Sequence, residues 1–377
     1  MSSTPKVPYI DLKAEYQALR SEIEPVVQKV LASGSYILGS ELQSFEQEAA
    51  GFLGSHFVAG VGSGTDAVEF ALRAVGVQPG DEVVVPAMTY VATAEAVVHA
   101  GARPVFCDID PDYYTMGTAQ VEAALTPKVK AILPVHLYGQ PCTMKTLTEL
   151  CKSKGLLVVE DCAQAIGAME GTQQVGSFGA GGAFSFFPTK NLGAYGDGGM
   201  VATQDPKHDE HVRMMRMHGS IKRDDHLFSG RSGRLDEIQA AILRIKLRHL
   251  NDWNQKRYEI AQLYHRMFED KLCPKVKGVK LPKERDGIKH VYHIYALRVP
   301  KRNQLVKHLN QQGIGALVHY SRPVHLQPAF SSSGLNAGDL PNAEALAAEV
   351  ISLPIYPGMS DGLVEQVVDS IVGFYTG

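Results

Sequence analysis

The sequence predicts an α/β protein with a mostly parallel central sheet, covered by helices on both faces, and a smaller α+β region at its C-terminal end. Short apolar runs such as 104–107 and 156–160 alternate with helical patterns through the first 250 residues. These runs lack polar alternation, which is typical of strands buried on both faces of a parallel sheet. After Lys275 strand and helix patterns mix differently. We therefore expect a large domain over 1–250, N-terminal helices included, and a small domain over 251–377.

The expected elements follow from the apolar spacing, taken in chain order. Residues 12–33 and 40–53 have the spacing of amphipathic helices, and the glycines at 34 and 39 bound a turn between them. Strands are expected at 56–61, 82–85, 104–107, 131–134, 156–160, 183–187, 199–202, 292–299 and 315–319. Helices are expected at 66–75, 90–100, 144–153, 207–218, 234–251, 302–312, 342–352 and 361–374. The polar stretch 220–233 reads as an exposed loop, and 321–340 as a mobile flap at the site.

Composition excludes several classes of protein. Hydrophobic residues make up 45% of the 377 residues and charged residues 20%, with a formal net charge of −3, so the basic surface that nucleic acid requires is absent. No apolar run reaches 18 residues, and the N-terminus has no hydrophobic signal core, so we expect neither a membrane partner nor secretion. The five cysteines form no C-x-x-C pair, and the histidines show no ligand spacing. These features predict a cytoplasmic protein without a metal site.

One lysine, Lys190, stands in an unusual setting. The apolar run 183–187 precedes it, and tight glycine turns at 193, 196, 198 and 199 follow. Partial burial would lower the pKa of the amine, and a neutral amine can attack a carbonyl carbon. The alternative is a solvated lysine on a glycine-rich loop, which is the usual place for a lysine.

A phosphate site is predicted where the strand at 56–61 runs into Gly62-Ser-Gly-Thr65 and a helix follows. Free backbone N–H groups and the helix dipole both favour an anion at such a junction. The segment is neither a P-loop, because no Gly-Lys-Ser/Thr follows, nor the dinucleotide fingerprint, because the last glycine is missing. The alternative is an ordinary helix N-cap.

An acid, Asp161, ends the apolar strand 156–160, where it could hold a protonated ring nitrogen or simply cap a turn. The chain thus presents, in order, a phosphate loop, the aromatic Tyr90, Asp161 and Lys190. These four parts suit pyridoxal 5'-phosphate: a helix N-terminus for the phosphate, a stacking ring, a carboxylate for the pyridine nitrogen and an amine for the aldehyde. Ligands of parallel sheets bind at the C-terminal ends of the strands, so the four parts should share one rim.

Several motifs in the same order make the chain resemble the DegT/StrS-type sugar aminotransferases, a branch of the fold-type I pyridoxal-phosphate transferases, along nearly its whole length. The matching segments are Gly34–Gly39, Ser63–Ala67, Pro86–Ala94, Val135–Gly139, Glu160–Ala165, Ser185–Gly193, Gly196–Gly199, Arg234–Ala241, Val318–Tyr320 and Ser352–Pro357.

The resemblance implies a role for each matching residue. Lys190 corresponds to the Schiff-base lysine, Asp161 to the acid on the pyridine nitrogen, and Gln164 to the residue near the ring hydroxyl. The remaining cofactor contacts would be Tyr90 for stacking and Gly64, Thr65 and Ser185 for the phosphate. Arg234, His319 and Tyr320 fall where relatives that aminate C3 of nucleotide sugars touch the substrate.

The resemblance also implies a homodimer with shared active sites, in which the segment before Arg234 reaches the partner's site. Many relatives have an asparagine two residues before this arginine, in contact with the cofactor phosphate across the interface. Here the residue is Ser232, which is shorter and has no amide donor, and Arg231 is a possible replacement. Lys222, Arg223, Arg231 and Arg234 would supply cations beside the site for a nucleotide diphosphate, unless they only solvate a loop.

The resulting expectation is an aminotransferase that moves an amino group, from L-glutamate, to a keto nucleotide sugar, with the keto group at C3. Such an enzyme would serve cell-surface glycan or antibiotic sugar biosynthesis. Three rival functions share the cofactor. A sugar dehydratase of the same family carries histidine where this chain has Lys190, a cyclitol aminotransferase would use the same machinery on a non-nucleotide acceptor, and a non-enzymatic regulator would merely bind the cofactor. The missing fingerprint disfavours a nicotinamide dehydrogenase.

Overall fold

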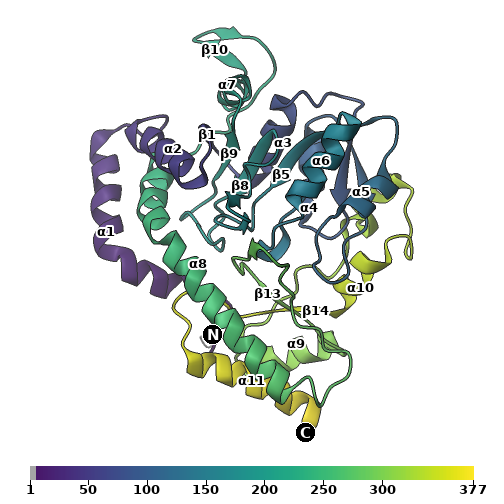
Figure 1. Ribbon diagram of the computed structural model, residues 1–377. Helices are drawn as coiled ribbons and strands as arrows, with labels where there is room; N and C mark the ends of the chain where they lie inside the picture. The colour runs from purple at the N-terminus through teal and green to yellow at the C-terminus, as the bar shows by residue number, and fades with distance from the viewer. Residues whose placement is uncertain (1–5) are drawn as a thin grey trace.

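A seven-stranded sheet in the order β1-β9-β8-β5-β4-β2-β3 lies at the centre of the computed structural model, which describes residues 6–377 (Figure 1). Strands β2, β3, β4, β5 and β8 pair in parallel, whereas β9 runs antiparallel to both β8 and β1. The predicted mostly parallel sheet is therefore confirmed. Its strands are β1 (Phe57–Val61), β2 (Glu82–Pro86), β3 (Arg103–Cys107), β4 (Val129–Ile132), β5 (Leu157–Asp161), β8 (Gly181–Ser185) and β9 (Gly199–Thr203).

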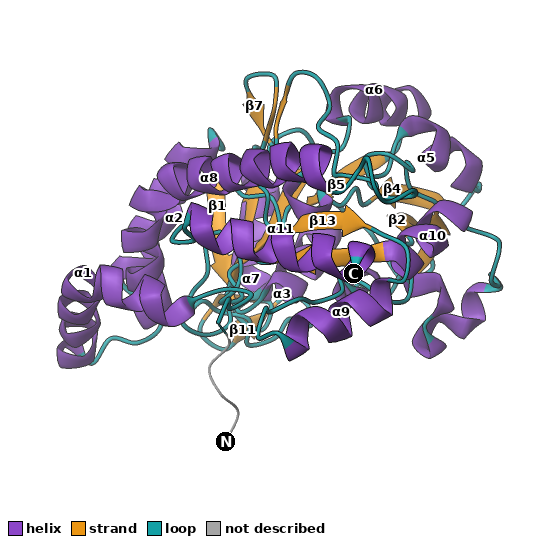
Figure 2. Ribbon diagram, turned by 90° about the horizontal axis from the view of Figure 1, so that it is seen from below, coloured by secondary structure: helices purple, strands orange, loops and turns teal. Residues whose placement is uncertain are grey.

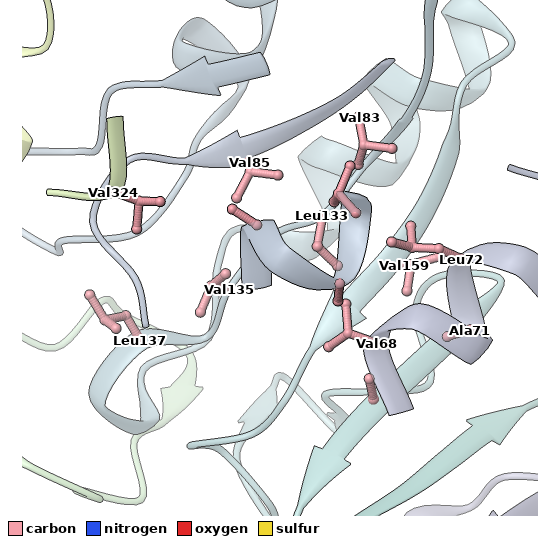
Figure 3. Packing of buried hydrophobic residues seen from close by; sticks show 14 of the residues in the cluster. Val68, Ala71, Leu72, Val83, Val85, Leu133, Val135, Leu137, Val159 and Val324 are labelled. Carbon is pink, nitrogen blue, oxygen red and sulfur yellow. The ribbon is translucent and has the colours of Figure 1, made fainter. Parts of the chain in front are cut away.

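Helices cover both faces of this sheet, as the sequence predicts. Figure 3 shows Leu72 of one covering helix beside Val159 of β5, within a core that continues to Val83 and Leu133. The strands are buried on both sides, because Val83 and Val85 join this core and Val84 joins another. One face packs against α3 (Gly64–Ala74), α4 (Val91–His99) and α7 (Pro206–Met215); the other packs against α2 (Ser40–Leu53), α5 (Thr118–Ala124), α6 (Met144–Lys154) and α8 (Glu237–Lys271).

A separate apolar core gathers residues of the C-terminal third, from Ile260 to Ile371, together with Val7. Seen from below, α8 and α11 lie side by side over this region (Figure 2). Its elements are the antiparallel pair β13 (Tyr295–Arg298) and β14 (Val350–Leu353), with α9 (Arg302–Gln311), α10 (Pro341–Glu349) and α11 (Asp361–Thr376). The boundary at residue 250 stays a prediction, because α8 runs across it without a break.

The N-terminal helix α1 (Leu12–Ser33) packs along α8 and has the predicted bounds. Gly34 ends it in the left-handed conformation, with φ of 67°, which glycine adopts without strain. Short elements that the sequence pattern did not predict complete the chain: β6 (Met169–Glu170), β7 (Gln173–Gln174), β10 (Ser220–Lys222), β11 (Asp225–His226), β12 (Ile288–Lys289), η1 (Leu137–Gly139), η2 (Val324–Leu326) and η3 (Pro328–Ser333). Among residues 6–377, none of the helices combines the length and apolarity that crossing a bilayer would take.

Several expectations for the C-terminal region were wrong. Residues 315–319 form no regular strand and pair only through a bridge between Leu317 and Ser352. The helix expected at 342–352 ends at Glu349, because Val350 and the residues after it pair with β13. The segment 321–340 is not a free flap: Val324 donates its N–H to Ala87 O at 2.8 Å, and Phe330 packs edge-on against Phe106. The stretch 220–233, which lies outside this region, is largely exposed as expected, and its residues 220–226 form the β10–β11 hairpin that projects at the top of Figure 1.

Candidate active site

A cavity of about 430 Å³ opens at the C-terminal ends of the parallel strands. A cavity therefore lies where the rim rule for parallel sheets predicts a ligand site. Nine residues singled out in the sequence line this cavity: Gly64, Thr65, Tyr90, Asp161, Gln164, Ser185, Lys190, His319 and Tyr320. Ser232 and Arg234 do not line it within the same chain.

One corner of the cavity has the geometry of an anion site. Strand β1 ends at Val61, and α3 begins at Gly64 with Ser63 as its N-cap, whose hydroxyl accepts the N–H of Asp66 at 3.1 Å. A Cβ at Gly64 would lie 2.6 Å from the Cβ of Ser185, so only glycine lets this loop approach Ser185. The start of α3 and the hydroxyl residues Thr65 and Ser185 thus line the same cavity, and a helix N-terminus with hydroxyl groups beside it suits a phosphate.

Asp161 ends β5 inside the cavity and is 5% exposed. Its Oδ2 accepts the hydroxyl of Thr93 at 2.8 Å, and its Oδ1 accepts the N–H of Ala163 at 3.1 Å. Burial raises the pKa of Asp161, whereas these two hydrogen bonds and the charge of Lys190 act against that rise. A cation beside the buried Asp161 carboxylate, such as a protonated ring nitrogen, therefore stabilises its charged form strongly.

Thr93 is a site residue that the sequence analysis missed. It is 3% exposed and lies one helical turn after Tyr90, which is the N-cap of α4. The hydroxyl oxygens of Thr89 and Thr93 are 2.8 Å apart. Because Thr93 donates to the carboxylate, its oxygen accepts the hydrogen of Thr89. Thr89, Tyr90 and Thr93 lie within the matching segment Pro86–Ala94. Their spacing was a signal that could have identified the two linked threonine hydroxyls.

Glu160, the neighbouring acid, points to the other face of β5, because successive strand residues alternate. Its carboxylate accepts the N–H groups of Gly176, Phe178 and Gly179 at 2.8 to 2.9 Å, and it lies 3.1 Å from His136 Nε2. Together with Cys162, these side chains form a buried group with the composition of a metal site. Its hydrogen bonds already occupy both carboxylate oxygens, so we interpret it as a structural support for the strand end.

Lys190 lies on a tight loop after β8 and is partly exposed to the cavity. Its N–H donates to Phe187 O at 2.8 Å, and the loop folds back so closely that a Cβ at Gly193 would meet Pro188 O at 2.3 Å. Burial lowers the pKa of Lys190 to about 8, and the charge of Asp161 opposes this shift. About a tenth of the amine is therefore neutral at pH 7, far more than for an unperturbed lysine, and the neutral amine is the nucleophile.

The opposite wall carries an amide and two tyrosines. Gln164 accepts the N–H of Tyr138 at 2.7 Å, which fixes its amide and turns its Nε2 towards the hydroxyl of Tyr320 at 3.2 Å. The hydroxyl of Tyr320 is thereby an acceptor, and its own hydrogen is free to donate. The ring of Tyr90 is 56% exposed and lies 5.6 Å from the ring of Tyr320, so an aromatic face is open to a bound ring.

Two histidines complete the cavity, of which the sequence analysis identified one. His319 Nδ1 lies 2.8 Å from Ser352 Oγ, and burial together with the charge of Lys190 lowers the pKa of His319 to about 4. His293 was missed, since a single histidine in an apolar strand pattern gives no signal. Burial and the charge of Lys190 also hold the pKa of His293 well below its usual range.

The cations of the β10–β11 region do not line this cavity within their own chain. Arg231 turns back onto α3, where it pairs with Asp66 and, at 2.7 Å, with Glu69. It is therefore not free to replace the missing asparagine as a phosphate contact. Arg234 donates to Ser232 Oγ at 2.5 Å. Lys222 and Arg223 pair with acids of the hairpin itself.

Comparison with known proteins gives consistent results. Residues 17–372 match the model of the DegT/DnrJ/EryC1/StrS aminotransferase family. A "Pleiotropic regulatory protein" of Geobacillus stearothermophilus is 46% identical, with 98% of each chain covered. A dTDP-3-amino-3,4,6-trideoxy-alpha-D-glucose transaminase of Streptomyces venezuelae is 43% identical over 98% of this chain and 96% of its own. A UDP-N-acetyl-3-dehydro-alpha-D-glucosamine 3-aminotransferase of Acidithiobacillus ferrooxidans is 42% identical over 98% of both.

The fold also matches a solved structure, S. venezuelae DesV in complex with a ketimine intermediate. The TM-score is 0.95 at 43% sequence identity, and the match covers 99% of this chain and 100% of that one.

Proposed function

Because the chain belongs to the DegT/DnrJ/EryC1/StrS aminotransferase family, we propose that it transfers an amino group from L-glutamate to C3 of a nucleotide-linked 3-keto hexose. The chain is a pyridoxal-phosphate-dependent sugar aminotransferase. The observation that carries this conclusion is the placement of Lys190 and Asp161 in one cavity with an anion-binding loop.

The residues present fit pyridoxal 5'-phosphate. The close approach of Gly64 to Ser185 leaves backbone N–H groups and hydroxyls for the phosphate, and the open face of Tyr90 suits the ring. Asp161 is the buried carboxylate for the ring nitrogen. When bound, the cofactor supplies an electron sink for the carbanion that forms as the amino donor loses its α-hydrogen.

The side chains of the cavity then have separate tasks. Lys190 Nζ is a base that takes a proton from the α-carbon of the donor and returns one to the cofactor side, since its lowered pKa keeps part of the amine neutral. Asp161 holds a proton on the ring nitrogen through its negative charge. Gln164 is the residue for the ring hydroxyl, and its amide is held in place by its hydrogen bonds with Tyr138 and Tyr320.

The acceptor is assigned from the relatives and from the cavity wall. The two sugar aminotransferases reported above are described by amino or keto groups at position 3 of dTDP- and UDP-linked sugars. His319 and Tyr320 offer neutral hydrogen-bonding groups to sugar hydroxyls, because the low pKa of His319 leaves it uncharged near neutral pH. Arg234 would provide the charge for the diphosphate from a second subunit.

Shared sites in a homodimer are supported by what one chain leaves incomplete. Ser232 and Arg234 do not line the active-site cavity of their own chain. The β10–β11 region exposes Ile221 and Leu227, which are 54% and 60% exposed and suit a protein contact. We further propose that the enzyme works in the reducing cytoplasm, because its cysteine thiols are all free.

The rival functions are separated by one experiment. One alternative is a non-enzymatic role, because one relative is named as a regulatory protein. The other alternative is a cyclitol acceptor in place of the nucleotide sugar. The purified protein should be incubated with pyridoxal phosphate, L-glutamate and a panel of 3-keto and 4-keto UDP- and dTDP-sugars and keto cyclitols, with products measured by mass spectrometry. Amination of 3-keto nucleotide sugars is expected. Efficient amination of 4-keto sugars or cyclitols alone would overturn the proposed acceptor, and absence of any product would favour the regulator.

A further inference from the structure

A second cavity, of about 340 Å³, lies where the first turns of α1 meet α8 and the segment after β14. It shares no lining residue with the active-site cavity. Ala14 and Ala18 line it from α1, Trp253 and Arg257 from α8, and Tyr356 from the segment after β14. Its volume is in the range of small-molecule sites, and no step of the proposed reaction uses it.

Arg257 is the buried cation of this cavity. Its side chain is 3% exposed, and its Nη1 donates to the carbonyl oxygen of Ile355 at 2.8 Å and to that of Tyr292 at 3.4 Å. Its Nε is buried without a hydrogen-bond partner, and none of residues 6–377 accepts a hydrogen bond from Nη2. A buried guanidinium without a counter-ion costs free energy, so a ligand that pairs with it is favoured.

The two free nitrogens form one side of the guanidinium. The N–H of Nε and one N–H of Nη2 point in the same direction, and together they match the two oxygens of a carboxylate. The bonds of Nη1 to two backbone carbonyls hold the plane of the group in place. Arg257 therefore presents a fixed, unoccupied carboxylate-binding fork at the wall of the cavity.

The acids of the cavity wall are engaged elsewhere. Glu15 pairs with Lys246 at 2.5 Å, and Asp11 Oδ1 accepts the N–H of Ala14 at 2.9 Å as the N-cap of α1. Both carboxylates repel further negative charge, so a singly charged anion fits this site better than a multiply charged one such as phosphate.

Most of the remaining wall is apolar or aromatic. These side chains are Ile10, Ala14, Ala18, Trp253, Tyr356 and Pro357. An occupant with an apolar body would bury that surface against them, whereas a small inorganic anion would leave it in contact with water.

We propose that this cavity binds a small monocarboxylate with an apolar body, and that Nε and Nη2 of Arg257 hold the two carboxylate oxygens. The site is separate from the active-site cavity. The inference depends neither on the identity of the sugar nor on that of the amino donor.

Binding is measured by isothermal titration calorimetry of the full-length holoenzyme with phenylacetate. We expect saturable binding. Phenylacetamide has the same shape without the charge and should bind about 10- to 100-fold more weakly, because a hydrogen bond to a charged group is stronger than one to a neutral group. Inorganic phosphate should also bind more weakly than phenylacetate.

Three variants place the binding in this cavity. Arg257→Lys keeps the positive charge and loses the planar fork, so affinity should fall about 10- to 100-fold. Ala18→Phe fills the cavity from an exposed position of α1 and should abolish binding. Gln17→Phe is the matched control, because Gln17 is exposed on the same helix but does not line the cavity, and wild-type affinity is expected.

Absence of saturable binding would overturn the proposal, and so would equal affinity for phenylacetamide, tighter binding of phosphate or unchanged binding in Ala18→Phe. Thermal unfolding of each variant shows whether it is folded. If Arg257→Lys is not, Ala18→Phe decides, because its position is exposed. None of these measurements involves turnover, so a failure of the keto-sugar assay is distinguishable from a failure here.

Discussion

Replacing Thr93 by valine tests whether the hydroxyl chain on α4 holds the anion of Asp161. Valine keeps the shape of threonine and removes the hydroxyl, which donates to Asp161 Oδ2 at 2.8 Å and accepts from Thr89. A hydrogen bond to a charged group contributes about 1.5–3 kcal/mol, and one pKa unit corresponds to about 1.4 kcal/mol. The pKa of Asp161, already raised by burial, should rise further by about one to two units.

The consequence appears in cofactor binding. A carboxylate that is harder to ionise pairs less well with a protonated ring nitrogen, so the dissociation constant of pyridoxal phosphate should increase about 10- to 100-fold. The assay is a titration of apoenzyme with cofactor, followed by absorbance, with turnover measured at saturating cofactor. Thr93→Ser retains the donor and is the matched control. Thr89→Val removes only the outer, neutral hydrogen bond of the chain and should have a smaller effect. Wild-type affinity and turnover in Thr93→Val would refute the reasoning.

Four further outcomes are expected. Lys190→Ala should lose several orders of magnitude in turnover while folding normally. In the wild type, borohydride should fix the cofactor to Lys190, which peptide mapping detects. An adduct on another lysine would contradict this role. Asp161→Asn should bind cofactor weakly and turn over slowly, and near wild-type rates would exclude it as the partner of the ring nitrogen. Mixing Lys190→Ala with Arg234→Ala subunits should recover activity in a verified heterodimer, whereas no recovery would place both residues in one subunit. The pKa of Lys190 is about 8 in the folded protein and about 10.4 in the unfolded chain, so the buried ammonium destabilises the apoenzyme below pH 8. The free energy of unfolding should therefore rise as the pH increases from about 8 to about 10.4. Lys190→Met should remove this pH dependence.

The sheet and its rim could be predicted because they depend on patterns local to the sequence. Apolar strands such as β5 are continuous in the sequence, and the acid that follows must then lie at the carboxyl edge. The apolar run alone does not distinguish Glu160 from Asp161, because both lie at its end, and Asp161 was assigned from the resemblance. The structure separates them through strand alternation, with Glu160 bound to backbone N–H groups on the far face and Asp161 in the cavity.

Contacts between distant segments could not be predicted. From the sequence, Arg231 is available as a phosphate contact. Only the packing of the hairpin against α3 brings it to Asp66 and Glu69, which are 165 and 162 residues away in the chain. His293 has no local signature, because its hydrogen-bond partner is Asn191 from a separate loop. The anchoring of the segment 321–340 could not be predicted either, because its contacts are with the distant residues Ala87 and Phe106, beside the strands of the large sheet.

Helix α8 shows why one boundary was wrong and what this implies about the site. The sequence predicts its end near residue 251, because polar residues interrupt the apolar spacing there, yet the helix continues to Lys271. Two of those polar residues are buried: Asn254 holds Asn191 at 2.8 Å, and Arg257 donates to Ile355 O at 2.8 Å. A buried polar side chain costs free energy unless it is bound, so these positions are explained by what they hold. Asn254 fixes the loop of Lys190, and Arg257, one turn on, fixes the segment after β14. The break in the pattern therefore marks the place where one helix holds both the loop of Lys190 and the segment after β14.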